Sequence, residues 1–275
     1  MSAEKITFIG GGNMAQSLIG GLIADGYRAD CVHVSDPDPQ QRINLASRFH
    51  VQVHTDNQAA IAHAQAVVVA VKPQVIKSVL EPLGPILRQQ QSLVISIAAG
   101  VREPDVSRWL GGQIPVVRTM PNTPALVRAG ATALYANRHV LPGQRDLAES
   151  LLRAVGVTQW LEDESLLDIV TALSGSGPAY FFLLMEILEA TAVESGLPQK
   201  TARLLTLETA LGAARMALES KEEPGHLRRR VTSPGGTTEA AMRVLESGGV
   251  QELFQRALQA AANRASELGR LLGEQ

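Results

Sequence analysis

The feature of this sequence that most constrains its fold is a short apolar segment that runs directly into a glycine-rich turn near the start. Residues 6–9 are apolar and rich in strand-forming side chains, so they predict a buried β-strand. Gly10, Gly12 and Ala15 follow with the spacing G-x-G-x-x-A, and residues 14–24 repeat apolar side chains at the helical interval. Strand, glycine turn and helix, in this order, are the context that a dinucleotide-binding fingerprint requires.

Each small residue of this turn has a separate use if a dinucleotide binds there. Gly10 permits the tight turn, Gly12 lets a pyrophosphate approach the backbone, and Ala15 lets the helix lie close to the strand. The phosphates would then meet free N–H groups at the positive end of the helix. An ordinary tight turn between strand and helix is the alternative, but the context favours dinucleotide binding.

Composition narrows the class of protein. The chain has 275 residues, 45% of them hydrophobic, a net charge of −2 and a pI of about 6.3, so charge gives no reason to expect a nucleic acid or membrane partner. Cys31 is the only cysteine, which fits a reducing compartment. Neither a charged leader nor an uninterrupted apolar run of about 18 residues is found. We expect a soluble, cytoplasmic protein.

The first 161 residues predict an α/β fold. Apolar segments alternate with helical patterns, as in a Rossmann-like, doubly wound parallel sheet, which we assign to residues 1–161 as a dinucleotide-binding domain. Further strands are expected at residues 31–36, 51–53, 66–71, 93–97, 116–119, 131–135 and 156–161. Helices are expected at residues 40–49, 57–63 and 75–87, the last broken near its prolines.

The remainder, residues 162–275, shows no strand pattern and predicts a C-terminal all-α domain. Residues 174–177, Ser-Gly-Ser-Gly, predict a break between helices, with Pro178 at the first position of the next helix. The expected helices cover residues 165–173, 178–195, 199–219, 224–230, 239–246 and 250–272. Such apolar helices suit a bundle that also forms a dimer interface.

Asp36 lies 26 residues after Gly10, near the position where a Rossmann fold places its ribose-binding carboxylate. There it would accept hydrogen bonds from the 2′-OH of NAD and repel the 2′-phosphate of NADP, and Ser35 and Arg42 could weaken that repulsion. Alternatively, Asp36 caps the turn before the prolines that follow it. The sequence leaves both interpretations open, and with them the choice between NAD and NADP.

Small or cationic residues follow the other predicted strands. Lys72 follows the strand at 66–71 and is placed to meet a phosphate or ribose, or else is an exposed turn lysine. Residues 98–100, Ala-Ala-Gly, leave room for a flat ring to lie against the backbone. The histidines show no metal-ligand spacing, so we predict no metal site.

A second anion-binding candidate is the stretch at residues 231–239, Val-Thr-Ser-Pro-Gly-Gly-Thr-Thr-Glu. It is a glycine loop that leads into a helix, where free N–H groups would bind an anion and hydroxyls could donate to a second polar atom. A helix cap with a flexible approach is the alternative. A cap needs one hydroxyl, however, and this stretch has four.

These motifs, in this order and spacing, resemble the pyrroline-5-carboxylate reductase family over nearly the whole chain. The resemblance rests on residues 8–15, 70–73, 96–100, 120–124, 174–180 and 231–238. It implies dimers with entwined helical domains, in some members assembled into a decamer of five dimers. The chain has Lys221 where some relatives carry a glutamate, which puts any substrate role of that stretch in doubt.

The resemblance also implies the site residues. NADP or NAD is the expected cofactor, and 1-pyrroline-5-carboxylate and L-proline are the expected substrate and product. Substrate contacts are expected from Ser233, Gly235, Gly236, Thr237 and Thr238, with Thr238 at the ring nitrogen as the catalytic residue. Cofactor contacts are expected from Gly10, Gly11, Gly12, Asn13, Met14, Ser35, Asp36, Asn57, Ala70, Val71, Lys72, Pro73, Ala98, Ala99, Gly100, Pro121 and Asn122.

Two rival functions make different demands on the sequence. A β-hydroxyacid dehydrogenase uses a catalytic lysine with an asparagine one helical turn later. Here Lys200 and Lys221 are followed four residues on by Leu204 and Gly225, which argues against that class. A redox sensor that binds NAD(P)H without turnover would need no second anion loop.

Overall fold

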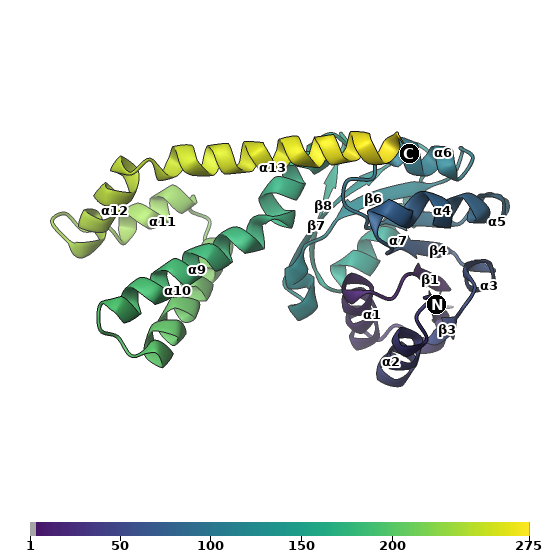
Figure 1. Cartoon of the computed structure of the whole chain (residues 1–275), viewed down its shortest axis with the longest axis horizontal. Coiled ribbons are helices and arrows are strands. Elements are labelled where there is room, and N and C mark those ends of the chain that lie inside the picture. The colour runs from purple at the N-terminus through teal and green to yellow at the C-terminus, as the bar shows by residue number, and fades with distance from the viewer. Residues whose placement is uncertain (1–3, 275) are drawn as a thin grey trace. The chain divides into compact units, whose positions relative to one another are not determined.

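The computed structural model describes residues 4–274. Its sheet has eight strands in the order β3-β2-β1-β4-β5-β6-β7-β8, with β1 near the middle of the parallel part (Figure 1). The strands are β1 (Ile6–Ile9), β2 (Val32–Ser35), β3 (Gln52–His54), β4 (Ala66–Val69), β5 (Leu93–Ser96), β6 (Val116–Met120), β7 (Gly130–Ala136) and β8 (Gly156–Leu161). Every strand that the sequence predicts is present, within two residues at each end.

The sheet is parallel from β3 to β6, but β7 runs antiparallel to β6, and β8 is parallel to β7. The predicted doubly wound, mainly parallel sheet is therefore confirmed, with one reversal of direction between β6 and β7 that the sequence did not indicate. Parallel neighbours need a crossover of a dozen residues or more. Only residues 121–129, which include the short 3₁₀ helix η4 (Thr123–Val127), connect β6 to β7, so the chain turns back on itself.

Helices cover both faces of the sheet. In chain order they are α1 (Asn13–Ala24), α2 (Pro39–Phe49), α3 (Asn57–Ile61), α4 (Ile76–Leu80), α5 (Gly84–Gln90), α6 (Glu103–Trp109) and α7 (Pro142–Arg153). One core cluster includes side chains of α1, α2 and α7, and the other includes side chains of α4, α5 and α6. Val67 and Val68 of β4 belong to different clusters, so this strand is buried on both faces, as its continuous apolar run predicts.

The predicted break at residues 174–177 is not a break in the helix. After α8 (Leu166–Val170) the chain makes one π-helical turn, Thr171–Gly175, in which the Ser176 N–H donates to the Thr171 carbonyl at 2.8 Å. It then continues as α9 (Gly177–Glu194). A π-turn absorbs one extra residue within a helix, so small residues do not have to end it.

The remaining helices are α10 (Gln199–Glu219), α11 (Pro224–Arg230), α12 (Thr237–Ser247) and α13 (Val250–Gly273). Packing divides the chain into two compact units: residues up to Ser176 together with those from Ala260 onward, and residues 177–259. These units differ from the expected domains because residues 162–176 and the end of α13 pack with the sheet. Leu272 of α13 belongs to its core, and the yellow end of α13 lies beside α6 (Figure 1).

Candidate active site

The first glycine loop connects β1 to α1 and is held between two neighbouring strands. The Gly10 N–H donates to the Ser35 carbonyl at 2.8 Å, and Gly10 has a φ of +96°. A Cβ atom at Gly10 would lie 2.7 Å from the Ala70 carbonyl oxygen, so only glycine fits there. A Cβ atom at Gly12 would meet nothing within 4 Å, which leaves open space beside the start of α1. This space is what a pyrophosphate needs.

The start of α1 offers backbone donors to that space. No side chain caps this end of the helix. No backbone or side-chain atom of residues 4–274 accepts a hydrogen bond from the N–H groups of Asn13 or Met14. Ala15 is fully buried, so the helix lies close to the sheet. Because unpaired N–H groups and the helix dipole both attract anions, these residues fit the phosphates of a dinucleotide.

Asp36 follows β2, and backbone N–H groups bind its carboxylate on both oxygens. Oδ2 accepts from the Gly11 N–H at 2.8 Å, and Oδ1 accepts from the Asp38 N–H at 2.9 Å. The second bond is the turn cap that the sequence left open. The first brings the carboxylate to the glycine loop, where a ribose-binding carboxylate is expected. This conformation is a turn cap and is also compatible with a ribose-binding role, which stays a prediction.

Ser35 precedes Asp36 in the chain, and Arg42 contacts the backbone of Asp36. Ser35 is 2% exposed, and its Oγ has no hydrogen-bond partner within the described part of the chain. Arg42 donates from Nη1 to the Asp36 carbonyl oxygen at 2.6 Å, which places its guanidinium beside the same turn. A cation there offsets part of the repulsion between Asp36 and a 2′-phosphate. The geometry is therefore compatible with either nucleotide.

The other predicted cofactor residues of the first half follow β3, β4 and β5. Asn57 begins α3 after β3, residues 70–73 follow β4, and residues 98–100 follow β5. Parallel strands place their carboxyl ends at one edge of a sheet, so these residues share that edge with the glycine loop. Lys72 is exposed there. A Cβ atom at Gly100 would lie 3.4 Å from Leu272, so α13 packs closely against this glycine.

Asn122 connects the turn after β6 to the π-helical segment. Its Oδ1 accepts from the Ala131 N–H at 2.9 Å, and its Nδ2 donates to the Ser174 carbonyl at 3.2 Å. Gly175 packs so closely on Met120 that a Cβ atom would lie 2.4 Å from its Cε. The structure therefore brings two predicted motifs together, residues 120–124 and the start of residues 174–180.

A buried ion pair that the sequence analysis did not single out lies next to this contact. Arg118 of β6 is 4% exposed, and its Nη1 lies 2.8 Å from Oε1 of Glu164. The same Glu164 oxygen accepts from the Glu103 N–H at 2.6 Å. Its sequence signal was an arginine within the predicted strand at residues 116–119, because a buried charge needs a partner. The pair fixes the approach to α8 against the end of β6.

The second glycine loop, residues 233–238, lies in the unit of residues 177–259 and precedes α12. Gly235 has a φ of +72°, and a Cβ atom at Gly236 would lie 2.5 Å from the Ser233 hydroxyl. Thr238 is half-buried in the first turn of α12. None of the residues 4–274 accepts a hydrogen bond from the N–H groups of Thr237 or Thr238. The expected anion-binding donors are thus present.

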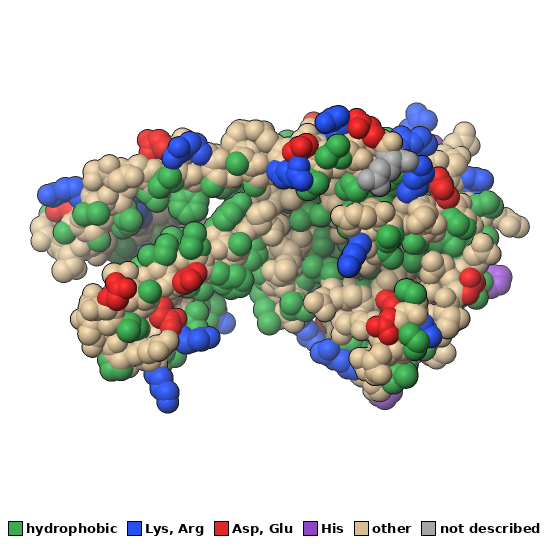
Figure 2. All heavy atoms as spheres, in the orientation of Figure 1, with side chains coloured by type: hydrophobic (Ala, Val, Ile, Leu, Met, Phe, Trp, Pro, Cys, Tyr) green, Lys and Arg blue, Asp and Glu red, His purple; other side chains and the backbone are tan. Residues whose placement is uncertain are grey.

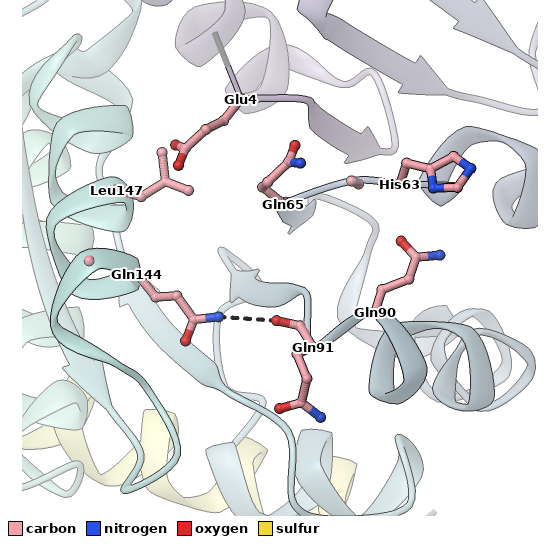
Figure 3. Close-up of a pocket in the computed structure, with 9 residues that line it drawn as sticks. Glu4, His63, Gln65, Gln90, Gln91, Gln144 and Leu147 are labelled. Atoms are coloured by element: carbon pink, nitrogen blue, oxygen red, sulfur yellow. Dashed lines mark hydrogen bonds between the residues drawn. The ribbon is translucent and has the colours of Figure 1, made fainter. Parts of the chain in front are cut away.

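A polar cleft of about 360 Å³ lies away from the first glycine loop (Figure 3). Its lining includes Glu4, Gln65 and Gln91, each just before the strand β1, β4 or β5, so it lies at the amino edge of the sheet. The Gln144 amide crosses it and donates to the Gln91 carbonyl at 3.1 Å. Ligands of open α/β sheets bind at the opposite edge, so this cleft is not the nucleotide site.

No group of three or more histidine, cysteine, aspartate or glutamate side chains that could hold a metal ion occurs within residues 4–274. The sequence prediction concerned the whole chain and stays a prediction.

The comparisons with known proteins decide the family. The curated pyrroline-5-carboxylate reductase of Pseudomonas aeruginosa is 52% identical over 274 residues, which cover 100% of both chains. This chain belongs to the pyrroline-5-carboxylate reductase family. The family model for pyrroline-5-carboxylate reductase dimerisation matches residues 164–268. The model for NADP oxidoreductase coenzyme F420-dependent matches residues 5–100.

Solved structures of pyrroline-5-carboxylate reductases share the whole fold. The Coxiella burnetii enzyme is 50% identical, with a TM-score of 0.93 over 97% of this chain and 99% of that one. The Plasmodium falciparum enzyme, solved with NADP bound, is 27% identical, with a TM-score of 0.87 over 98% and 99% of the chains. The Rossmann-like domain with a helical C-terminal part is thus the fold of this reductase family.

The region that matches the dimerisation model exposes much apolar surface. Of the 18 residues of α9, only Gly177 is buried, whereas Phe181 and Phe182 are more than 60% exposed. Figure 2 shows hydrophobic side chains gathered over this part of the molecule. The continuous helix Leu166–Glu194 is long and apolar enough on average to cross a membrane. Charged residues such as Glu186 and Glu189 interrupt it, so the prediction that there is no uninterrupted apolar run of about 18 residues still holds. A surface of this kind equally suits contact with another protein chain.

Proposed function

We propose that this chain reduces 1-pyrroline-5-carboxylate to L-proline with NAD(P)H, as the last step of proline biosynthesis. The observation that carries the proposal is the similarity to pyrroline-5-carboxylate reductases over the whole chain, together with the presence of both glycine loops. Each loop leads into a helix whose first N–H groups, those of Asn13 and Met14 or of Thr237 and Thr238, have no acceptor within residues 4–274. One loop suits a dinucleotide, and the other suits a small carboxylate.

In the proposed reaction NAD(P)H supplies a hydride to the carbon of the C=N bond, and a proton reaches the nitrogen. The loop at residues 10–14 holds the pyrophosphate, and residues 98–100 with Pro121 and Asn122 flank the nicotinamide. The loop at residues 233–238 binds the substrate carboxylate and so fixes the face of the ring. The Thr238 hydroxyl hydrogen-bonds the ring nitrogen and helps deliver its proton. A protonated imine is already electrophilic, so positioning supplies most of the effect, about 7–11 kcal/mol at best.

The proposal extends to assembly and location. The poorly buried helices α9 and α10 pair with those of a second copy to form a dimer, and five dimers form a decamer. The apolar helix Leu166–Glu194 lies in that interface rather than in a membrane. With a net charge of −2 and one cysteine, the protein works in the cytoplasm without nucleic acid or membrane partners.

Steady-state oxidation of NADH and of NADPH tests this function. With 1-pyrroline-5-carboxylate, we expect the reduced nucleotide to be oxidised and L-proline to form. With a β-hydroxyacid and NAD or NADP, we expect no reduction of the nucleotide. Turnover of the hydroxyacid instead would identify the rival dehydrogenase class. Tight nucleotide binding without turnover of either substrate would favour a sensor.

A further inference from the structure

One donor of the second glycine loop is already bound by a side chain of this protein. The Gly235 N–H donates to Oε2 of Glu239 at 2.8 Å. The neighbouring Gly236 N–H donates to the Ser233 carbonyl at 3.0 Å, so it is used within the loop. A carboxylate of the chain therefore occupies a donor of the loop that is proposed to bind the substrate carboxylate.

An ordinary helix cap does not fully account for this contact. Glu239 is the third residue of α12, and in a capping box the third residue bonds back to the N–H of the capping residue, which here is Gly236. The bond instead goes one residue further, to Gly235. Because Gly235 lies outside the helix with a φ of +72°, the carboxylate reaches into the loop itself.

Glu239 also has a second partner in reach. Nη2 of Arg243, one helical turn later, lies 3.9 Å from the same Oε2 atom. The Arg243 side chain is 77% exposed and the Glu239 side chain 42%, so neither is locked by packing. The same carboxylate oxygen therefore lies between the loop N–H and a guanidinium that can hold it when it leaves the loop. The loop donor can thus be released without leaving an unpaired charge.

We propose that Glu239 is a specificity-determining residue of the imine-reductase site, an inference that rests on the proposed function. Its carboxylate competes with the carboxylate of the substrate for the Gly235 N–H, and turns toward Arg243 when the substrate binds. A negative charge at this loop repels a ligand according to the ligand's net charge. A doubly charged inorganic anion is repelled most, whereas a monocarboxylate that carries its own iminium cation is repelled least. Glu239 thereby keeps simple anions out of the substrate loop.

Two variants separate this role from capping. Glu239→Gln keeps the size and an acceptor oxygen but removes the charge, and Glu239→Ala removes both. For the protein saturated with NADPH, we expect the inhibition constant of sulfate, competitive with 1-pyrroline-5-carboxylate, to fall about tenfold in both variants. The KM for the substrate should fall by a smaller factor, about twofold to threefold, because the substrate is less strongly repelled. The KM for NADPH should not change.

Glu246→Gln is the matched control. Glu246 lies in the last turn of the same helix, and its Oε1 lies 2.9 Å from Nη1 of Arg228, so this variant removes an equal charge without touching the loop. Its sulfate inhibition should equal that of the wild type. If both Glu239 variants also keep the wild-type inhibition constant, or show a higher substrate KM together with a lower melting temperature, Glu239 is only a cap and the proposal is overturned.

Calorimetric titration of sulfate into the NADPH-bound protein tests the role of Glu239 independently of the proposed reductase function. It measures binding to the loop without turnover. Tighter sulfate binding by both Glu239 variants, in a protein that does not reduce the imine, would refute the reductase assignment but retain the competition at Gly235. Equal sulfate binding by the wild type and both variants would refute the competition, whatever the enzyme reduces.

Discussion

The carboxylate of Asp36 accepts hydrogen bonds from the N–H groups of Gly11 and Asp38, so its position beside the glycine loop is fixed before any nucleotide binds. A carboxylate at this position would accept a hydrogen bond from the 2′-OH of NAD and would repel the 2′-phosphate of NADP. Arg42 bonds to the backbone of the same residue rather than to its carboxylate, so the negative charge is only partly offset.

Replacement of Asp36 by serine should therefore shift cofactor preference toward NADPH. We expect the ratio of kcat/KM for NADPH to that for NADH to rise by about tenfold or more, equivalent to ~1.4 kcal/mol. Asp38→Ser is the control, because Asp38 caps α2 through the Gln40 N–H without contacting the loop. An unchanged ratio in Asp36→Ser, measured by steady-state kinetics with both nucleotides, would leave Asp36 as a turn cap alone.

Thr238 is the one side chain to which the proposed mechanism gives a chemical role. Thr238→Ala should lower kcat roughly 100-fold, the size expected for loss of a positioned proton donor, while the dissociation constant of NADPH stays near wild type. Ser247→Ala is the control, since that hydroxyl donates to the Val244 carbonyl at the far end of α12. Wild-type turnover in Thr238→Ala would remove this residue from the mechanism.

At the scale of elements, β2 and β3 bring two histidine side chains into contact. His33 Nδ1 lies 2.8 Å from His54 Nε2, and the rings stack with centroids 5.0 Å apart. Burial, with smaller contributions from the charges of Lys5 and His54, lowers the pKa of His33 to about 4. Burial and the charge of Lys5 also lower the pKa of His54. The folded protein therefore takes up protons at these sites less readily than the unfolded chain.

Stability should depend on pH through this pair. The pKa of His33 is below its ordinary value of 6.5, so its contribution is present above pH 6.5 and is lost as the pH falls toward about 4. Urea unfolding at a series of pH values should show the free energy of unfolding decrease across this window, and His33→Gln should flatten the decrease. His226→Gln, at an exposed histidine on α11, should retain the wild-type slope. An identical slope in both variants would contradict the assignment.

The strands were predictable because their apolar, β-branched runs are buried on one or both faces, as with residues 66–69 of β4. The direction of β7 was not predictable. It depends on whether the segment between β6 and β7 contains a crossover helix, and the composition of residues 121–129 does not show that it lacks one. The helices α6 and α7 were missed. α6 is only seven residues long, and α7 begins with Pro-Gly, which resembles a turn.

The local geometry of the candidate site was predictable where the backbone demands a particular residue, as at Gly10. It was not predictable where residues far apart in the sequence pair with each other. Arg118 and Glu164 are 46 residues apart and meet only in the folded chain. The contact of Gly100 with Leu272 likewise joins distant segments. The bond from Gly235 to Glu239 is local, but glycines and hydroxyls in a loop do not reveal which N–H group a nearby carboxylate binds.

At the scale of the whole molecule, the helices of residues 177–259 are too poorly buried to form a core alone. Of the 21 residues of α10, which all lie within the described range, only Ala202 is buried. Apolar surface of this extent favours association with a like surface. The dimer is therefore expected to be a condition for stable folding of this region, rather than a later addition.

Phe182→Glu should disrupt that association. Phe182 is 64% exposed in α9, and a charge there would be buried without a partner at an apolar interface. Sedimentation equilibrium should show the wild type as a dimer or larger and the variant as a weaker dimer, with a dissociation constant raised at least about 100-fold. Ile43→Glu, at a residue of α2 that is 60% exposed, should assemble like the wild type. Equal assembly of all three proteins would place the interface elsewhere.

A crystal structure of the protein with NADPH and L-proline would test the central claim most directly. The account predicts that the N–H groups of residues 233–238 bind the carboxylate of proline, and that the proline ring lies in van der Waals contact with a nicotinamide held by the loop at residues 10–14. The two loops can belong to one subunit or to two. A structure in which residues 233–238 lie far from the nicotinamide in every subunit of the assembly would contradict it.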